Sequence, residues 1–285
     1  MQEHNQFALL RERRFGPFFL TQFFGAFNDN LFKNALVILI TYQAGSVAGL
    51  SAAQMVQVCL GLFILPFFLI SATAGQLADK YEKSRLIRWV KMFELAVMAC
   101  AAYAFLSNNI VILVTMLFLM GVHSAVFGPV KYSILPQHLR EEDLVGGNGL
   151  VESGTFLAIL LGTILGGVLI ADREWGRILA AAGVVLIAAV GLVTSYRVPH
   201  SPPDEPGLAI NWNLFSETWR NLRWLQGHRT VMLSVLGISW FWFFGAVFIN
   251  QFPSYAKDYL HGSEQVATAL LAVLSIAIAV GSLLC

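Results

Sequence analysis

An aspartate lies near the middle of the first long apolar run of this sequence, which extends from about residue 17 to about residue 42. A run of this length can cross a bilayer, since about 20 helical residues span about 30 Å of hydrocarbon. An ionised carboxylate such as that of Asp29 costs at least about 2.5–3.5 kcal/mol at the bilayer centre. The sequence therefore predicts that Asp29 faces a partner group or a wet cavity, and not lipid.

The composition is that of a membrane protein. Hydrophobic residues make up 57% of the chain and charged residues 12%, whereas soluble domains carry about 25% charged residues. The net charge of +1 predicts no nucleic-acid partner. Cys59, Cys100 and Cys285 lie in apolar segments without ligand spacing, so we expect small core residues and no metal site.

Further apolar runs follow the first, and they predict an all-α membrane protein with about eight transmembrane helices. The predicted spans lie at about 17–42, 54–75, 86–106, 110–130, 144–171, 177–196, 230–255 and 264–285. With a cytoplasmic N-terminus, most of the 18 Lys and Arg residues fall on the cytoplasmic side. Arg173, Arg177 and Lys257 fall on the other side, and Lys33 lies within the membrane. This asymmetry predicts that the N-terminus is cytoplasmic.

The loop between the second and third predicted spans carries a recognisable motif, Gly-Gln-Leu-Ala-Asp-Lys-Tyr-Glu-Lys-Ser-Arg, at residues 75–85. It resembles the signature loop of the major facilitator superfamily, G-x-L-a-D-[RK]-x-G-[RK]-[RK]. Glu82 replaces the usual second glycine, and Ser84 replaces a basic residue. The alternative is a solvated basic turn with no further role.

The expected roles in this conformational-switch loop follow from residue chemistry. Gly75 would let two helices approach, and Asp79 would cap or pair with a neighbouring helix end. Lys80, Lys83 and Arg85 would hold the loop in the cytoplasm.

The fifth predicted span carries small residues at intervals of four: Gly146, Gly154, Ala158, Gly162 and Gly166, interrupted at Leu150. This spacing places them on one stripe, where a neighbouring helix can pack closely. The stripe partly resembles the glycine-rich fifth-helix motif of the same superfamily. Gly167 occupies the motif's proline position, so an antiporter assignment does not carry over.

Residues 197–229 interrupt the hydropathy and predict a linker. Several prolines stiffen its first part. Trp212, Phe215, Trp219 and Leu222 then recur at helical spacing, which predicts either an amphipathic helix on the cytoplasmic membrane face or a packed soluble helix. The predicted organisation is a six-helix transporter half at 1–196, this linker at 197–229, and the start of a second half at 230–285.

An internal repeat supports this division. The segment Phe-Phe-Gly-Ala-Val-Phe-Ile-Asn at 243–250 echoes Phe-Phe-Gly-Ala-Phe-Asn-Asp-Asn at 23–30. Major facilitator proteins consist of two six-helix halves related as parallel repeats. The chain would then hold the first half and the first two helices of the second, as a fragment of a longer protein. A natural eight-span protein is the alternative.

Three further segments carry a closer resemblance. They are Gly-Ala-Phe-Asn-Asp-Asn-Leu-Phe-Lys at 25–33, Phe-Gly-Pro-Val-Lys-Tyr at 127–132 and Gly-Leu-Val-Glu-Ser at 149–153. The chain resembles the lysophospholipid transporter branch, and most closely the form fused to a downstream phospholipid acyltransferase. The resemblance implies a flippase of the bacterial inner membrane that moves lysophosphatidylethanolamine-type lipids to the cytoplasmic leaflet for re-acylation, with no enzyme in this segment.

Such a zwitterionic head group presents an ammonium and a phosphate. We expect Asp29 to bind the ammonium and Lys33 or Lys131 the phosphate. The neutral donors and acceptors of the predicted substrate site are Asn28, Asn30 and Gln22. The simpler alternative is a mutual pair between Asp29 and Lys33 that only neutralises two buried charges.

Two more acids lie in predicted spans. Glu94 and Glu152 could bind a coupling cation, H⁺ or Na⁺, or pair with Lys91 or Lys131; Glu152 is also a substrate-site candidate. His123 is interpreted as a hydrogen-bonded interior histidine and not as a proton relay.

Three other functions compete with this one. A drug or sugar porter of the same superfamily would share the fold without needing the acid–amide cluster of the first span. A passive membrane anchor for a fused acyltransferase would have no use for Asp29. A membrane enzyme is disfavoured because the sequence has no G-x-S-x-G elbow and no metal-ligand cluster.

Overall fold

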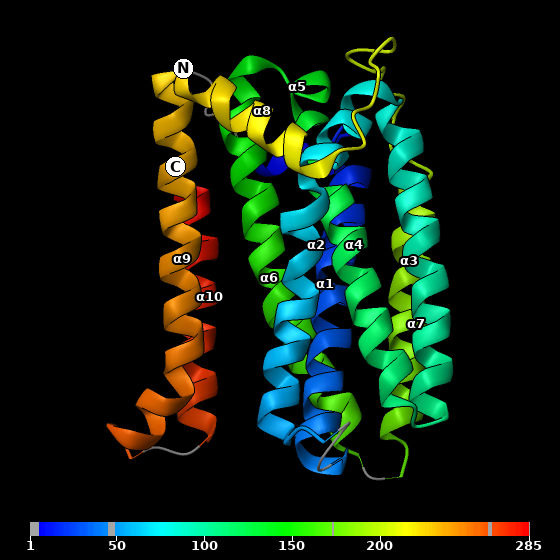
Figure 1. The fold of residues 1–285 in the computed structure, drawn as a ribbon, viewed down its shortest axis with the longest axis vertical. Helices are drawn as coiled ribbons and strands as arrows, with labels where there is room; N and C mark the ends of the chain where they lie inside the picture. Colours follow the sequence, from blue (N-terminus) through cyan, green and yellow to red (C-terminus); the bar gives the residue numbers. More distant parts are fainter. Residues whose placement is uncertain (1–5, 45–48, 173, 262–263, 285) are drawn as a thin grey trace.

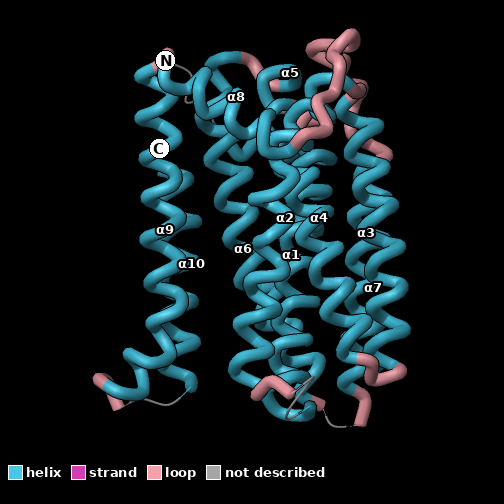
Figure 2. The backbone as a smooth tube through the Cα atoms, in the orientation of Figure 1, coloured by secondary structure: helices cyan, strands magenta, loops and turns pink. Residues whose placement is uncertain are grey.

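The computed structural model describes residues 6–44, 49–172, 174–261 and 264–284, and this part of the chain is helical without strands (Figure 2). The long helices are α1 (Gly16–Leu39), α2 (Ala52–Lys80), α3 (Lys83–Leu106), α4 (Ile110–Ser133), α6 (Leu144–Ala171), α7 (Gly176–Ser195), α9 (Arg229–Asp258) and α10 (Glu264–Leu284). The short elements are η1 (Gln6–Arg11), the π-helical turn η2 (Ile40–Ala44), α5 (Leu135–His138), η3 (Glu141–Asp143) and α8 (Leu214–Gln226).

Helices α1, α2, α3, α4, α6 and α7 pack together as a bundle, and α1 lies near its middle in Figure 1. Helix α1 packs against α6 and α7, α2 packs against α4, and α3 packs against both α4 and α7. Helices α9 and α10 form an antiparallel pair that joins the bundle through α6. Leu31, Phe32 and Leu36 of α1 are fully buried in the larger apolar core, which the apolar sides of the surrounding helices complete.

The membrane character is confirmed, while the count of eight spans stays a prediction. Within the described residues, five helices are long and apolar enough to cross a membrane: α2, α3, α4 with α5, η3 with α6, and α7. Helix α1 is 24 residues long, but its polar residues at 28–30, 33 and 34 lower its hydropathy. The apolar parts described in α9 and α10 are shorter, Arg229–Gly245 and Ala272–Leu284.

Glycines set the distance between α1 and α6. A methyl group added at Gly162 would lie 2.3 Å from the carbonyl oxygen of Phe27, and one at Gly166 would lie 2.3 Å from that of Leu31. Both obstacles are backbone atoms, so no side-chain rotation could relieve them. The prediction that this stripe allows close helix packing is confirmed, and its partner is the helix that carries Asp29.

The signature loop is shorter than the sequence suggested. Helix α2 continues to Lys80 and α3 begins at Lys83, so only Tyr81 and Glu82 lie between them. The expectation that Gly75 allows helices to approach is wrong for the described chain, because no neighbouring atom lies within 4 Å of a methyl group added there. Asp79 meets the linker through its backbone carbonyl, which accepts a hydrogen bond of 2.9 Å from Glu205.

Lys83, which is predicted to hold this loop in the cytoplasm, is covered by the linker, so the alternative of a solvated basic turn is wrong at this residue. Its ammonium, fully buried, lies 2.8 Å from Asp204 Oδ2. The backbone N–H of Ser201 donates to Glu82, and Gln76 exchanges two hydrogen bonds with the backbone of Asn211. The linker is therefore tied along its length to the ends of α2 and α3.

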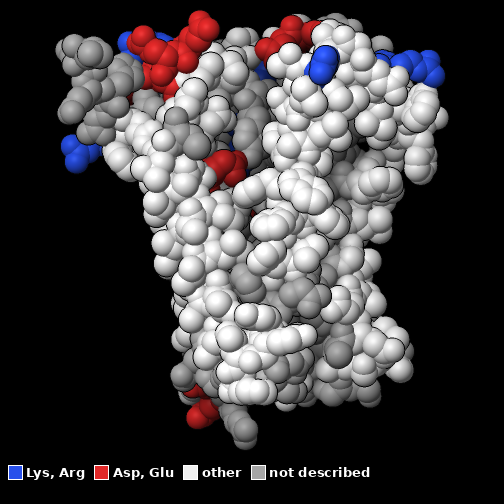
Figure 3. Space-filling view, turned by 90° about the vertical axis from the view of Figure 1, so that its left-hand side faces the viewer, with Lys and Arg blue, Asp and Glu red and all other residues white. Residues whose placement is uncertain are grey.

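Beyond Asn211, helix α8 contains most of the residues of the predicted aromatic stripe. Its residues Leu214, Phe215, Trp219 and Leu222 form an apolar groove with Phe68 and Leu69 of α2. Phe215 and Trp219 stay largely exposed. Helix α8 lies at the same end of the bundle as α5 and the α2–α3 turn (Figure 1), and charged side chains gather at this end in Figure 3.

The three cysteines do not share one environment. Cys59 is fully buried, as predicted for a small core residue. Cys100 is exposed, so the interpretation as a core residue is wrong there, because its side chain lies on the outer side of α3. Cys285 lies outside the described residues.

Candidate functional site

A buried polar cluster joins α1, α3 and α4. Lys91 and Glu94 have fully buried side chains, and Lys91 Nζ lies 2.7 Å from Glu94 Oε2. Asn28 of α1 donates its amide to Glu94 Oε1 at 3.0 Å, and His123 Nε2 of α4 lies 3.2 Å from Glu94 Oε2. Of the two partners considered for Glu94, Lys91 is therefore the one present. Gly25 permits this arrangement, since a methyl group there would lie 2.4 Å from Lys91 Nζ.

Asp29 lies beside this cluster on a less buried face of α1. Ser124 of α4 donates its hydroxyl to Asp29 Oδ2 at 2.6 Å. Lys33 directs its ammonium to Asn30 Oδ1 at 2.8 Å and lies 5.3 Å from the centre of the Phe63 ring. The alternative of a mutual Asp29–Lys33 pair is wrong in this structure, because each group has another partner.

A second polar group lies nearer the α5 and α8 end of the bundle. Thr155 of α6 receives a hydrogen bond of 2.8 Å from Lys131 and donates one of 3.0 Å to Gln22. Glu152 lies 3.7 Å from Lys131 Nζ and accepts a hydrogen bond from the Tyr132 hydroxyl. Gln22, Lys131 and Glu152, all predicted site residues, thus belong to one network across α1, α4 and α6.

The two groups occupy separate levels. Gln22 precedes Asp29 by seven residues on α1, and Lys131 follows Ser124 by seven residues on α4. At about 1.5 Å per residue, seven residues correspond to about 10 Å along each helix. The backbones of Asp29 and Lys131 therefore lie about 10 Å apart along the bundle, whereas Lys33 lies one helical turn from Asp29.

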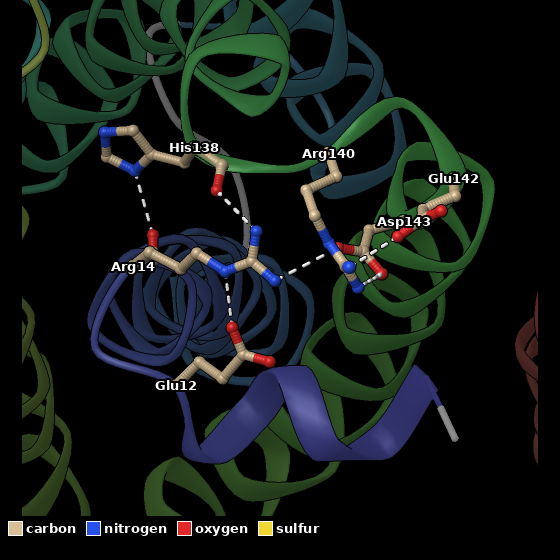
Figure 4. Close-up of polar contacts among 6 residues, drawn as sticks. All are labelled: Glu12, Arg14, His138, Arg140, Glu142 and Asp143. Carbon is tan, nitrogen blue, oxygen red and sulfur yellow. Dashed lines mark hydrogen bonds and ion pairs between the residues drawn. The ribbon is translucent and has the colours of Figure 1, made fainter. Parts of the chain in front are cut away.

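A third network closes the end of the bundle near the N-terminus (Figure 4). Arg14 donates to the carbonyl of His138 at 3.2 Å and to the buried carboxylate of Asp143 at 3.0 Å. His138 Nδ1 lies 2.8 Å from the carbonyl of Arg14, so this nitrogen carries the proton. His138 Nε2 is then the acceptor for the Ser201 hydroxyl at 2.6 Å. The network joins the N-terminal segment, the α4–α6 connection and the linker.

Sequence reasoning missed the hydroxyl partners, Ser124 and Thr155. Neither belongs to a motif, and their roles depend on which helices pack together. Ser124 directly follows His123 in an apolar span, which is the one local signal that could have drawn attention to it. In the repeat at 243–250, the side chains of Ile249 and Asn250 lie outside the described residues.

A helical bundle with buried ionic groups inside apolar helices defines a multi-pass membrane protein of the transporter class. The model of the Major Facilitator Superfamily matches residues 18–285, so the chain belongs to this superfamily. No solved structure matches the chain.

Three of the curated relatives carry the name lysophospholipid transporter LplT. The protein of Enterobacter sp. (strain 638) is 31% identical over 225 residues, which cover 78% of this chain and 52% of the relative. The protein of Serratia proteamaculans (strain 568) is 29% identical over 227 residues, with the same coverage of 78% and 52%. That of Escherichia coli O7:K1 is 30% identical over 231 residues, covering 78% of this chain and 53% of the relative. The chain thus spans about half the length of these relatives.

Proposed function

We propose that the protein containing this chain is a lysophospholipid flippase that moves lysophosphatidylethanolamine-type lipids to the cytoplasmic leaflet. The observation that carries this proposal is the half-buried carboxylate of Asp29, one helical turn from the ammonium of Lys33 within a bundle of apolar helices. The names of the relatives point to the same substrate class.

The spacing of charges on α1 suits a phosphoethanolamine group. Four helical residues rise about 6 Å, which is close to the separation of a phosphate from the ammonium two carbons beyond it. Asp29 would receive the ammonium through Oδ1, which has no hydrogen-bond partner, and Lys33 would receive the phosphate. Asn30 holds Lys33 by accepting its hydrogen bond, and Asn28 donates to the neighbouring Glu94.

Lys131 is the second candidate for the phosphate. Along the helices, Lys131 lies about 10 Å closer to the α8 end than Asp29 does, at the level of Gln22, Thr155 and Glu152. This second level would hold the phosphate after the head group has left Asp29. Two phosphate positions, Lys33 on α1 and Lys131 on α4, would divide the path of the head group into two shorter steps.

The acyl chain needs an apolar surface that is continuous with the lipid. Trp242 of α9 stacks on Phe156 of α6 with ring centres 5.9 Å apart, and Trp240 is largely exposed. These rings would contact the single acyl chain between α6 and α9. Because this surface would take one acyl chain, a lysolipid would be preferred to a diacyl lipid.

The membrane placement belongs to the same proposal. The protein would lie in the bacterial inner membrane with its N-terminus cytoplasmic, because the N-terminal segment, α8 and the α2–α3 turn share the charged end of the bundle. The α2–α3 turn and the flanking helix ends, with Gly75, Asp79, Lys80, Lys83 and Arg85, would act as the conformational switch. A fused or associated acyltransferase would then re-acylate the delivered lipid.

The experiment is uptake of radiolabelled lysophosphatidylethanolamine into spheroplasts that express the full-length protein. Asp29→Asn should lower uptake by about 10- to 100-fold, because a hydrogen bond to a charged group contributes about 1.5–3 kcal/mol. Asp172→Asn is the matched control, since Asp172 is exposed and caps only the backbone of Glu174 and Trp175. Unchanged uptake in Asp29→Asn would remove the head-group role.

The competing porter function has its own outcome in this assay. If the wild-type protein takes up no lysolipid but binds a sugar or a drug, the superfamily assignment stands and the substrate class is wrong. If the protein takes up nothing but still brings a fused acyltransferase to the membrane, this result would favour the anchor function.

A further inference from the structure

We propose that an anionic phospholipid of the surrounding bilayer binds on the outer side of the bundle, where α3 begins and α7 ends, with its phosphate on Arg85 and Arg88. The inference goes beyond the proposed function, because this lipid stays bound at the edge of the protein and is not carried across. The site is separate from the buried polar cluster, since Arg85 is exposed whereas Lys91 and Glu94 lie on the buried face of the same helix.

The start of α3 and the end of α7 lie together. The two helices pack against each other at the edge of the bundle opposite to α9 and α10 (Figure 1). The backbone N–H of Lys83, where α3 begins, donates to the carbonyl of Ser201 in the linker that follows α7. The guanidinium of Arg88 lies 5.8 Å from the centre of the Tyr196 ring, at the C-terminal cap of α7. One ligand at this place can therefore contact both helices.

The two arginines of α3 have donors to spare. Arg85 and Arg88 are three residues apart, so their side chains are neighbours on the helix surface. The side chain of Arg85 forms no hydrogen bond or ion pair with any residue that the structure describes. Arg88 donates through Nη2 to Ser84 Oγ at 3.1 Å, and its buried Nε has no partner. A guanidinium is a planar fork of five N–H donors that fits a phosphate, so both side chains suit this ligand.

The acid nearest to these arginines in the sequence is occupied elsewhere. Glu82 accepts hydrogen bonds from the backbone N–H groups of Ser84 and Arg85 and from that of Ser201. One of its oxygens also lies 3.4 Å from His200 Nδ1. Its carboxylate therefore caps α3 and holds the linker, and it leaves the charges of the arginine side chains without a partner.

Aromatic and apolar side chains continue the site toward the middle of the membrane. Trp89 is exposed and packs edge-on against Tyr81 of the α2–α3 turn, with ring centres 6.3 Å apart. Met92 and Phe93 are exposed one turn further along α3. From Arg85 to Phe93 the helix rises about 12 Å, and its outer face passes from basic through aromatic to apolar. Phosphate, interface and acyl chains follow one another in the same order in a phospholipid.

The charges select an anionic head group. Arg197, just beyond the end of α7, is exposed and adds a third positive charge that no described residue neutralises. A zwitterionic lipid would bring its ammonium toward three arginines and find no carboxylate there. The polar site on α1 differs in this respect, because Asp29 and Lys33 offer one charge of each sign. The outer site therefore favours phosphatidylglycerol over phosphatidylethanolamine.

The bound lipid would hold three segments together: the α2–α3 turn through Tyr81, the start of α3 through its arginines, and the end of α7 through Tyr196. A ligand that binds only the folded arrangement stabilises it. Phosphatidylglycerol should therefore raise the unfolding midpoint of the protein, and phosphatidylethanolamine with the same acyl chains should do so far less.

The test titrates the purified full-length protein in detergent with each of these two lipids. Native mass spectrometry counts the bound lipids, and thermal unfolding measures their effect. The double variant Arg85→Gln with Arg88→Gln should weaken phosphatidylglycerol binding by about 10- to 30-fold, because each basic residue near anionic lipid contributes about a factor of five. Its binding of phosphatidylethanolamine should not change.

Arg11→Gln with Arg13→Gln is the matched control. Both residues are exposed in the N-terminal segment, so the control loses the same charge outside the site. A second variant, Trp89→Ala, keeps every charge and should also weaken lipid binding, because it removes the aromatic part of the site. It tests the site even if the double arginine variant fails to fold.

The proposal is overturned if the wild type binds the two lipids equally, or if the charge-matched control loses as much as the double variant. Wild-type binding in Trp89→Ala, or equal protection by inorganic phosphate, would show that a free anion and not a lipid is the occupant. None of these measurements involves uptake of a lysolipid. Failure of the proposed function would therefore leave the result intact.

Discussion

Adding one methyl group at Gly162 or Gly166 should separate α1 from α6. An ordinary contact between carbon and a carbonyl oxygen is about 3.3 Å, and the added carbon would begin 2.3 Å from the oxygen of Phe27 or Leu31. The helices must therefore move apart by about 1 Å, and overpacking of this kind costs about 1–3 kcal/mol. The displaced helix carries Asp29, so transport should fall together with stability.

The double variant makes the prediction sharper. Gly162 and Gly166 contact successive turns of the same helix, so one displacement of α1 relieves both clashes. Gly162→Ala and Gly166→Ala together should therefore cost clearly less than the sum of the two single changes. Additive losses would mean that each clash is relieved locally and that α1 does not move as a unit.

The assay is thermal unfolding of the detergent-solubilised full-length protein, followed by loss of its monodisperse peak in size exclusion. Gly61→Ala and Gly128→Ala are matched controls, because a methyl group at either helical position would meet nothing within 4 Å. These controls should be neutral or slightly stabilising, since Ala is favoured over Gly in helices by about 0.5–1 kcal/mol. A midpoint unchanged in Gly162→Ala would refute the reasoning.

Two further predictions concern the linker. Asp204→Asn should lower the unfolding midpoint more than Lys83→Met, because it leaves the buried ammonium of Lys83 without its carboxylate. The expected cost is about 1–2 kcal/mol, after allowance for the half-exposed side chain of Asp204. The reverse order of the two midpoints in the same assay would contradict this. Partial burial alone would raise the pKa of Glu82, but backbone hydrogen bonds, led by that of Ser201, lower it below the ordinary value of 4.5. A depressed carboxyl pKa stabilises the folded state at pH values above the ordinary pKa, and this stabilisation is lost as pH falls through the folded pKa. The unfolding midpoint of the wild type should therefore drop on acidification below about pH 4.5, and the midpoint of Glu82→Gln should drop less.

Local pattern was sufficient for much of the fold. The apolar runs at 86–106 and 110–130 became α3 and α4, since helix formation inside a membrane depends mainly on hydropathy and length. The glycine stripe of α6 was also predictable, because a four-residue spacing places residues on one helix face whichever helix packs against it.

The site was only partly predictable, because its contacts join helices far apart in sequence. Asp29 could be selected from its cost in lipid, but its partner Ser124 follows only from the packing of α1 against α4. The pairing of Lys83 with Asp204 was invisible because 121 positions separate the two residues. Lys91, counted with the cytoplasmic charges, is instead fully buried beside Glu94.

The positions of these partners also bear on the order in which the chain can enter a membrane during synthesis. Lys91 and Glu94 lie on one helix, three residues apart, so α3 can neutralise its own charges as soon as it forms. On α1, Lys33 lies one turn from Asp29 but bonds to Asn30 in the folded protein, and the hydroxyl partner of Asp29 is synthesised 95 residues later. Until α4 arrives, the charge of Asp29 can therefore be neutralised only by Lys33 or by protonation.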